Sequence, residues 1–382
     1  MKNKLSFKLD VRAYTLILAL IAIFAIFTVL TNGDFISSRN ITNLSRQMTV
    51  IGVLAVGMTL IIVAGHIDLS VGSLLGLTGG IAAILQVWYD WHTIPVIIVT
   101  IIAGILLGLW QGWWVAYKGV PAFIVTLGGM MIFRGILLGI SGGQTVSPMD
   151  DGFRAIGQSF IPYSIGYIIT AAFIVLGFVM VARKRTRRQQ LGLDLQAKAV
   201  DYGTMAVVAV LISLFVYMLS RYHGVPVPLL ILLVVAGILI FITKNTTFGR
   251  HIYAIGGNKE AAKLSGINIK RNVLYVFVLM GALSAVGGII LTSRLNAGTV
   301  GAGEMYELDA IAAVVIGGTS LMGGVGTIVG SLLGALIMAS IDNGMSMMNV
   351  APFWQYIVKG LILILAVWLD ISSKKKSGAD TS

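Results

Sequence analysis

Long apolar runs constrain this chain more than any other feature. About twelve stretches follow one another, each with close to the roughly 20 apolar residues that an α-helix needs to cross a bilayer. They cover approximately 11–30, 48–64, 70–88, 94–117, 121–141, 163–182, 203–220, 225–243, 273–292, 308–323, 326–343 and 353–370. Of all residues, 57% are hydrophobic and 11% are charged. The sequence therefore predicts an all-α, polytopic membrane protein with about 10–12 transmembrane helices.

The basic residues predict the orientation of these helices. The formal net charge is +12, and its main clusters lie near the N-terminus, in "RKRTRR" at 183–188, in 244–271 and in 374–376. With a cytoplasmic N-terminus, the sixth, eighth and twelfth runs all end at such a cluster on the same side, as the positive-inside rule expects. We therefore predict cytoplasmic N- and C-termini, and we expect lipid rather than nucleic acid as a partner.

Two other features restrict the chemistry. The chain has no cysteine, which excludes disulfides, thiolate metal sites and cysteine nucleophiles. With four histidines and no paired carboxylates at metal-ligand spacing, we predict neither a metal site nor an enzyme. The first run is too long for a signal-peptide core, and it is expected to stay as the first span.

The hexapeptide "VGSLLG" occurs twice, at 71–76 and 329–334. Each copy belongs to a series of glycines four residues apart, which lets two membrane helices approach closely. These series are Gly72, Gly76 and Gly80; Gly326, Gly330 and Gly334; and a third of Gly104, Gly108 and Gly112. Internal duplication is the alternative. The count of runs sends both copies in one direction, whereas inverted repeats run oppositely, so the choice between packing and common ancestry stays open.

The sequence contains no recognisable ATP-binding site that could drive a transporter. No G-x-x-x-x-G-K-[ST] sequence is present, so energy must come from a partner, an ion gradient or the solute gradient. Ion coupling would use carboxylates inside spans, but the five candidates are expected at or near span ends, where water reaches them: Asp68, Glu304, Glu307, Asp309 and Asp342. Arg134 and Lys359 are expected to lie deeper. The pair His66 and Asp68 is weak evidence for a proton relay.

The basic loop 244–272 offers a possible partner site. Within "TFGRHIYAIGGNKEAAKLSGINIKRN", Asn258 is a plausible N-cap, 259–265 a short helix, and Gly266 the left-handed residue that ends it. The pattern predicts a helix of one to two turns that projects into the cytoplasm among cations. A solvated connector is the alternative reading.

Four segments resemble a known family. "GGNKEAAKLSG" resembles the coupling-loop signature of the permeases of ATP-binding-cassette importers, and "FGRHIYAIGGNKEAAKLSGI" with "AGHIDLSVGSLLGLTGG" resembles their ribose, xylose and galactose branch. "QGWWVAYKGVPAFIVTLGGMMIFRGILLGI" and "IMASIDNGMSMMNVAPFWQYIVKGLILILAVWLD" are most similar to the xylose-type members. The resemblance covers nearly the whole chain.

The resemblance implies roles for individual residues. The coupling helix that docks on an ATP-binding subunit would contain Glu260, Ala261, Ala262 and Gly266, with Asn258 at its start and Arg250 and Gly256 shaping the loop. A second family motif, of unassigned duty, matches Asp68, Leu69, Ser70 and Gly72. Gly76, Gly326, Gly330 and Gly334 would serve packing within or between chains. No residue is assigned to the substrate path.

The resemblance also implies a function and an organisation. The chain would be a single permease domain, 1–382, with N-terminal spans (1–162), an inserted pair (163–224), a span with the coupling loop (225–272) and C-terminal spans with a basic tail (273–382). It would move a monosaccharide across the inner membrane by alternating access, and the xylose-type resemblance indicates D-xylose as that sugar. Two permease chains would form the transport path. ATP and Mg would bind the partner ATPase, this chain would hold no cofactor, and an extracytoplasmic binding protein would deliver the sugar. A stand-alone secondary transporter or facilitator is the alternative.

Overall fold

The computed structural model describes residues 11–193 and 197–379, with side chains over 15–193 and 197–372. The basic residues predicted to mark the two termini, at 2–12 and 374–376, lie outside the described side chains. The helices are α1 (Val11–Leu30), α2 (Ser38–Val63), α3 (Val71–Val87), α4 (Thr93–Ala116), α5 (Ala122–Ser141), α6 (Asp151–Gln158), α7 (Tyr163–Gln190), α8 (Lys198–Ser220), α9 (Val227–Asn245), α10 (Thr247–Gly257), α11 (Lys259–Leu264), α12 (Ile269–Leu295), α13 (Tyr306–Ile316), α14 (Ile328–Met347) and α15 (Pro352–Ala379).

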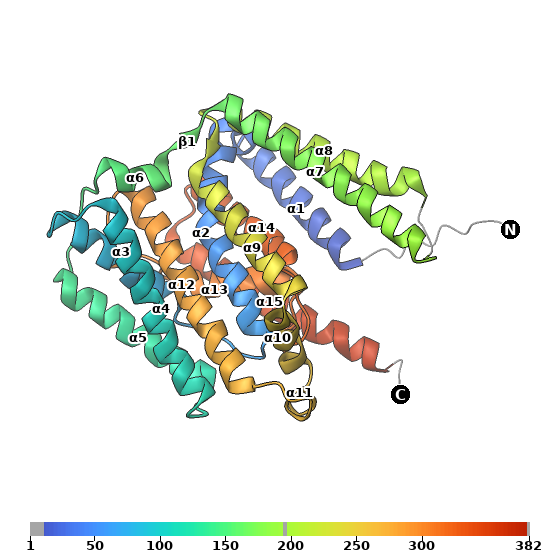
Figure 1. Cartoon of the computed structure of the whole chain (residues 1–382). Helices are drawn as coiled ribbons and strands as arrows, with labels where there is room; N and C mark the ends of the chain where they lie inside the picture. Colours follow the sequence, from blue (N-terminus) through green and yellow to red (C-terminus); the bar gives the residue numbers. More distant parts are fainter. Residues whose placement is uncertain (1–10, 194–196, 380–382) are drawn as a thin grey trace.

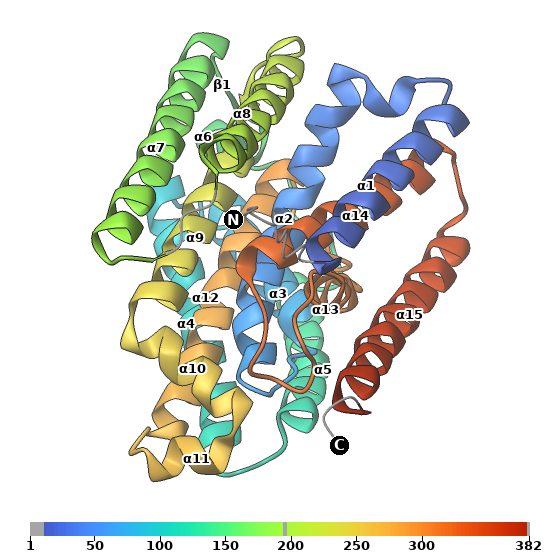
Figure 2. The same cartoon turned by 90° about the vertical axis from the view of Figure 1, so that its right-hand side faces the viewer.

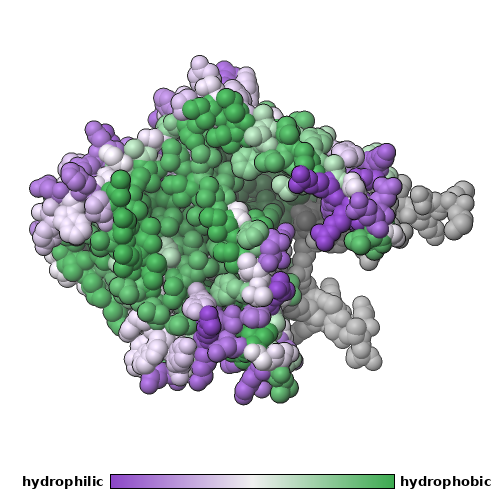
Figure 3. Space-filling view, viewed as in Figure 1, coloured by the Kyte–Doolittle hydropathy of each residue, from purple (hydrophilic) through white to green (hydrophobic). Residues whose placement is uncertain are grey.

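The prediction of an all-α membrane protein is confirmed. Within the described residues, nine helices are long and apolar enough to cross a membrane, and α1 and α3 add shorter apolar helices. One 3₁₀ turn, η1 (Asp34–Ile36), and two antiparallel two-residue strands, β1 (Phe160–Ile161) and β2 (Val225–Pro226), complete the elements. A broad apolar face covers the middle of the molecule, and hydrophilic residues gather toward its rims (Figure 3).

Helix α2 forms the centre of the bundle. It packs against α9, α12, α13 and α14, with α6 and β1 at one end of the molecule and α10 and α11 at the opposite end (Figure 1). We call these the β1 end and the α11 end. Helices α2 and α14 are antiparallel, because Asn40 Nδ2 donates to Asn343 Oδ1 (2.8 Å) near one end, and Thr59 Oγ1 donates to Ser331 Oγ (2.7 Å) near the other. Such bonds hold helices together where lipid provides no hydrophobic driving force.

The second helix begins ten residues earlier than the sequence pattern indicates. The apolar run begins near residue 48, but α2 begins at Ser38, and the Ser37 side chain accepts a hydrogen bond from the Asn40 amide (3.3 Å). Four polar side chains of its first turns are buried, those of Asn40, Thr42, Ser45 and Thr49. The hydroxyls of Ser45 and Thr49 donate to main-chain carbonyls one turn back. Because these groups are satisfied within the helix, polarity there does not mark a loop.

Close glycine contacts join α4 to α12. A Cβ at Gly104 would meet the main chain of Gly281, and one at Gly108 would meet the main chain of Phe277 and Gly281. The two helices thus pack with their backbones nearly in contact, as small residues four apart permit.

Helices α7 and α8 form a hairpin that extends away from the rest of the bundle (Figures 1 and 2). Most of α7 is exposed, including nearly all of its apolar stretch. The hairpin is held by its own contacts, including an ion pair between Arg185 and Asp201 and stacked rings of Phe178 and Tyr202. Such an apolar, exposed pair of helices requires lipid around it.

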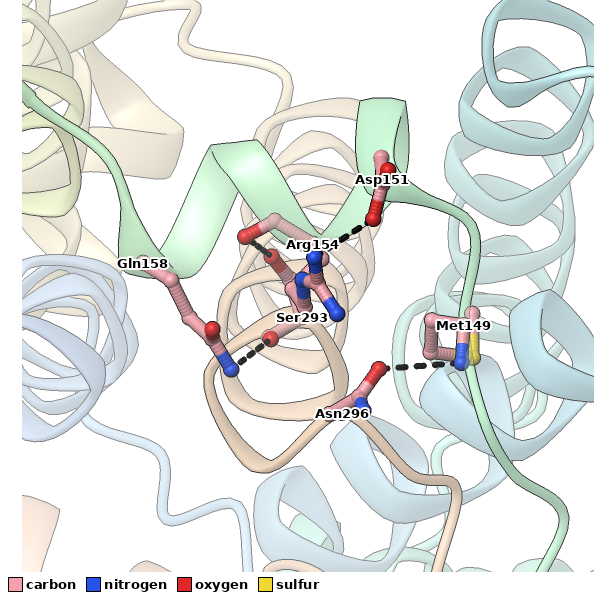
Figure 4. A network of polar contacts seen from close by, with 6 residues as sticks. All are labelled: Met149, Asp151, Arg154, Gln158, Ser293 and Asn296. Carbon is pink, nitrogen blue, oxygen red and sulfur yellow. Dashed lines mark hydrogen bonds and ion pairs between the residues drawn. The ribbon is translucent and has the colours of Figure 1, made fainter.

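The short helix α6 is fixed to the end of α12 by polar contacts (Figure 4). The Ser293 hydroxyl donates to the Phe153 carbonyl (2.6 Å) and accepts from the Gly157 amide (2.5 Å). Gln158 Nε2 donates to the Arg294 carbonyl (3.1 Å), and the Met149 amide donates to Asn296 Oδ1 (3.0 Å). These bonds close the β1 end of the bundle.

The prediction of a continuous membrane-spanning helix over 308–323 is wrong. Helix α13 contains only 11 residues, enough for about half the thickness of a bilayer core. Before it, Gly298 pairs with Val146 near α6; after it, the Gly324 amide donates to the Val63 carbonyl (2.9 Å) at the α11 end. Segment 296–327 therefore passes from one end to the other as loop, short helix and loop. We call it the broken span.

Side chains and tight packing protect the backbone of the broken span. Arg134 Nη1, on α5, donates to the carbonyls of Val300 (2.6 Å) and Ala302 (3.0 Å). Non-helical backbone at membrane depth needs such partners, since lipid offers none. The glycines of "GGTSLMGGVG" interrupt the apolar run at 317–326, and the three apolar residues among them, Leu321, Met322 and Val325, do not suffice to continue the helix.

Candidate functional site

The short helix predicted in the basic loop is confirmed. Helix α11 begins after Asn258, whose Oδ1 accepts a hydrogen bond from the Ala261 amide (2.9 Å). It ends at Ser265 and Gly266, and Gly266 has φ +78°, the left-handed conformation that glycine adopts without strain. Local capping residues thus fix both ends of the helix.

Helix α11 protrudes from its end of the molecule (Figure 1). Ala262 is buried against the protein, whereas Glu260 and Ala261 are exposed. Leu264, the last residue of this helix, is 88% exposed. The end of this protruding helix therefore offers an exposed apolar side chain for contact with another molecule.

Helix α10 joins α11 to the interior. The Thr246 side chain caps it by accepting from the Gly249 amide (3.2 Å), and Tyr253 Oη donates to the Gly326 carbonyl (2.7 Å). Gly256 lies so close to the broken span that a Cβ there would be 2.6 Å from the Gly324 nitrogen. Arg250 is exposed on α10, away from this contact. The loop after α13 and the helix before α11 are therefore packed main chain to main chain.

A cavity of about 810 Å³ opens beside α11. The loop after α2, the turn between α4 and α5, α11 and the start of α12 form its walls. His66 lies in this lining, where burial, with a smaller contribution from the Lys259 ammonium, lowers its pKa from 6.5 to about 4. His66 is therefore neutral at pH 7, which does not favour a proton relay with Asp68 at that pH.

The pKa of His66 predicts a pH-dependent stability. The unfolded chain takes up a proton near pH 6.5 and the folded chain only near pH 4, so stability falls as the pH is lowered from 7.5 to 5. We expect the melting temperature of the detergent-solubilised protein to fall less over this range in His66→Gln than in the wild type. Equal shifts in the two proteins would show that His66 contributes nothing to the acid sensitivity.

The motif of Asp68, Leu69 and Ser70 fixes the start of α3. Asp68 Oδ1 accepts from the Ser70 amide (2.8 Å) and from Ser70 Oγ (2.6 Å), which in turn accepts from Gln111 Nε2 (2.8 Å) on α4. The Leu69 amide donates to Thr126 Oγ1 (3.1 Å) on α5. This network joins the loop after α2 to two further helices, a structural arrangement that spacing alone does not reveal.

The carboxylates expected to be within reach of water are mostly buried. Glu304 is exposed, but Asp68 is 2% exposed and Asp309 is 0% exposed. Lys359 Nζ, from α15, lies 2.8 Å from Asp309 Oδ2 on α13 and 2.9 Å from Asp342 Oδ2 on α14. The expected access to water is therefore wrong for Asp68 and Asp309. Asp342 lies near the end of α14 with its side chain 23% exposed, and it forms a largely buried ion-pair cluster with Asp309 and the lysine. Glu307 is also largely buried.

The structure places both hexapeptides against the broken span. On α3, Gly72 and Gly76 face the main chain of Gly303 and Ala302, while Gly80 faces the Leu137 side chain. On α14, Gly330 and Gly334 face the main chain of Gly317 and Ala313. Gly326 precedes α14 and packs on Thr319, so the predicted helical series of three glycines is wrong at its first member.

Comparison with known proteins gives the family. Residues 40–367 match the family described as branched-chain amino acid transport system / permease component. The chain belongs to this permease family. No solved structure matches it.

Several individual relatives of this permease are named as sugar transport proteins. It is 52% identical over 369 residues to the xylose transport system permease protein XylH of Escherichia coli K12, covering 97% of this chain and 94% of the relative. XylH of Haemophilus influenzae is 50% identical over 96% of this chain and 98% of its own length. The ribose import permease protein RbsC of Haemophilus influenzae is 37% identical, with 97% of each chain covered.

Proposed function

We propose that this permease is the membrane-spanning subunit of an ATP-driven importer of D-xylose. The observation that carries the proposal is the identity of 50–52% to xylose transport permeases over nearly the whole chain. The ribose import relatives are more distant, which favours xylose over ribose. Because the chain has no P-loop, any ATP-derived energy for transport has to come from another subunit.

The geometry supports α11 as the site where the ATP-binding subunit docks. The helix is rigidly capped, it protrudes, and it carries Leu264 almost fully exposed. Glu260, Ala261 and Ala262 lie in it, and Gly266 ends it. In this proposal the N- and C-termini and α11 face the cytoplasm of the cell, and two permease chains and an extracytoplasmic sugar-binding protein complete the transporter.

Transport needs no covalent chemistry on the sugar. ATP and Mg on the partner subunits would draw those subunits together, and α11 and α10 would transmit the movement to the broken span. The contact between Gly256 and Gly324 and the bond from Tyr253 to Gly326 provide a short, stiff connection for this purpose. A segment with only 11 helical residues in the membrane is suited to change position between inward and outward openings.

Co-purification tests the docking of an ATPase. From a tagged Leu264→Glu variant produced in the native host, we expect recovery of the ATP-binding subunit to fall severalfold relative to the wild type, because a charge replaces the exposed apolar contact. Leu191→Glu, at an exposed leucine between α7 and α8, is the matched control and should recover the subunit normally.

Transport in vesicles separates the importer from a stand-alone carrier. Xylose uptake should require the ATPase, the binding protein and ATP, and it should survive collapse of the proton gradient. If the wild-type chain alone moves xylose and no ATPase is recovered with it, the chain is a secondary transporter or facilitator.

A further inference from the structure

Four lysines surround the cavity beside α11. They come from three different segments: Lys118 from the turn between α4 and α5, Lys259 and Lys263 from α11, and Lys270 from the start of α12. All four are exposed. We call the cavity with these residues the lysine basin.

Little negative charge balances the lysine basin. Glu260 is the one carboxylate in its described lining, and none of the described ion pairs involves the four lysines. The N-terminus of the 27-residue helix α12 also opens on the cavity at Ile269 and adds the positive end of its dipole. The basin is therefore a concave surface with a strong excess of positive charge, which favours an anionic partner.

Aromatic residues position two of the lysines. Lys118 Nζ lies 4.8 Å from the centroid of the Trp113 ring, and Lys270 Nζ lies 5.9 Å from that of Tyr117. Such contacts restrict flexible side chains before a partner arrives, so less entropy is lost on binding. Lys118 is remote from α11 in sequence, whereas Lys270 lies six residues after Leu264, the last residue of α11. Neither lysine belongs to the segment "GGNKEAAKLSG" that indicated a coupling helix.

We propose that the lysine basin accepts an acidic segment of the ATP-binding subunit beside the docked α11. This inference rests on the proposed function, and it extends the docking surface from one helix to a pocket of defined chemistry. The partner presents carboxylate side chains that enter a cavity of about 810 Å³, large enough for several side chains. The apolar contact at Leu264 and the charged contact in the basin then act together, and the charges steer association and fix orientation.

Binding measurements with purified proteins test the inference. We expect Lys118→Glu and Lys270→Glu each to weaken binding of the solubilised permease to its ATPase about tenfold or more at low salt, and the double variant more strongly. The difference from wild type should shrink at high ionic strength, where screening weakens the attraction. Lys244→Glu, an exposed lysine at the end of α9 outside the cavity, makes the same charge change and should bind like the wild type.

Each outcome decides between the possibilities. If wild type binds the ATPase and the basin variants bind it equally well, the basin inference is wrong while the proposed function stands. If those variants instead lose only binding to phosphatidylglycerol vesicles, the basin is a lipid site and the inference is also wrong. If the wild type binds no ATPase, the proposed function itself fails.

Two further variants guard against misfolding. Lys118→Gln and Lys270→Gln remove the charge without reversing it and should give intermediate affinities, with unchanged melting temperatures.

A suppressor selection provides an independent test. We expect that a change of an acidic residue to lysine on the ATPase restores the transport lost in Lys270→Glu. This ATPase variant should bind Lys270→Glu again but bind the wild-type permease more weakly.

Discussion

Gly256→Ala is expected to destabilise the permease by about 3 kcal/mol and to abolish sugar uptake. The added Cβ would overlap the Val63 carbonyl and lie 2.6 Å from the Gly324 nitrogen, and both are main-chain atoms that cannot turn aside as a side chain can. Helix α10 and the loop after α13 would have to separate. Thermal unfolding in detergent and uptake in vesicles that contain the complete transporter measure the two effects.

The neighbouring glycine is the matched control for this prediction. A Cβ at Gly257 meets no heavy atom within 4 Å, and Gly257 is exposed. Gly257→Ala should therefore unfold within about 0.5 kcal/mol of the wild type and transport normally. Equal behaviour of the two variants would contradict the close packing of α10 on the broken span.

Comparing the effect of Gly256→Ala on stability with its effect on uptake tests whether α10 transmits movement from the ATPase to the broken span. If Gly256→Ala folds at low temperature but transports nothing, while ATPase binding through α11 persists, the contact between α10 and the broken span transmits the movement. Spatial proximity alone would not establish that link. A parallel Tyr253→Phe variant loses only the bond to the Gly326 carbonyl and should reduce uptake less severely.

Local sequence signals predicted the helices and α11 well. A run of apolar residues and a cap such as Asn258 act within a few residues, so they can be recognised without the fold. The start of α2 was missed because buried serines and threonines bond to their own helix, and polarity alone does not reveal that. The break at α13 was missed because length-based counting treats 308–323 as one apolar run.

The hexapeptides illustrate why repeated sequence was hard to interpret. Both copies begin helices that run from the α11 end toward the β1 end, and the glycines of both face the main chain of the broken span. One copy contacts the loop before α13, and the other contacts α13 itself and the residue after it. Close packing of two helices on one irregular segment accounts for the shared pattern of small residues, with or without common ancestry.

The buried cluster at Lys359 depends on contacts that no local pattern contains. Its three members come from α13, α14 and α15, and each was weighed separately as a charge in or near a span. The available signal was the position of Lys359 within an apolar run, because a lysine inside a membrane span usually pairs with an acidic residue. The sequence alone did not tell which carboxylates would supply the pair.

Lys359→Met is expected to cost about 3–5 kcal/mol of stability, because it leaves two carboxylates in the interior without their cation. Asp309 is 0% exposed, and its second oxygen, Oδ1, has no hydrogen-bond partner among the described residues, so water cannot replace the lysine readily. Among the described contacts, α15 packs mainly against α13, and the lysine fixes this pairing. We expect a large drop in melting temperature and a loss of transport.

Neutralising the carboxylates should recover much of this loss. In the triple variant Lys359→Met, Asp309→Asn and Asp342→Asn, no buried charge remains without a partner, so more than half of the lost stability should return. Transport need not return with it, because the amides and the thioether do not reproduce the ion pairs that join α15 to α13 and α14. A single Lys359→Met variant that melts like the wild type would show that these carboxylates are not buried charges, and that α15 is held in place by its apolar contacts alone.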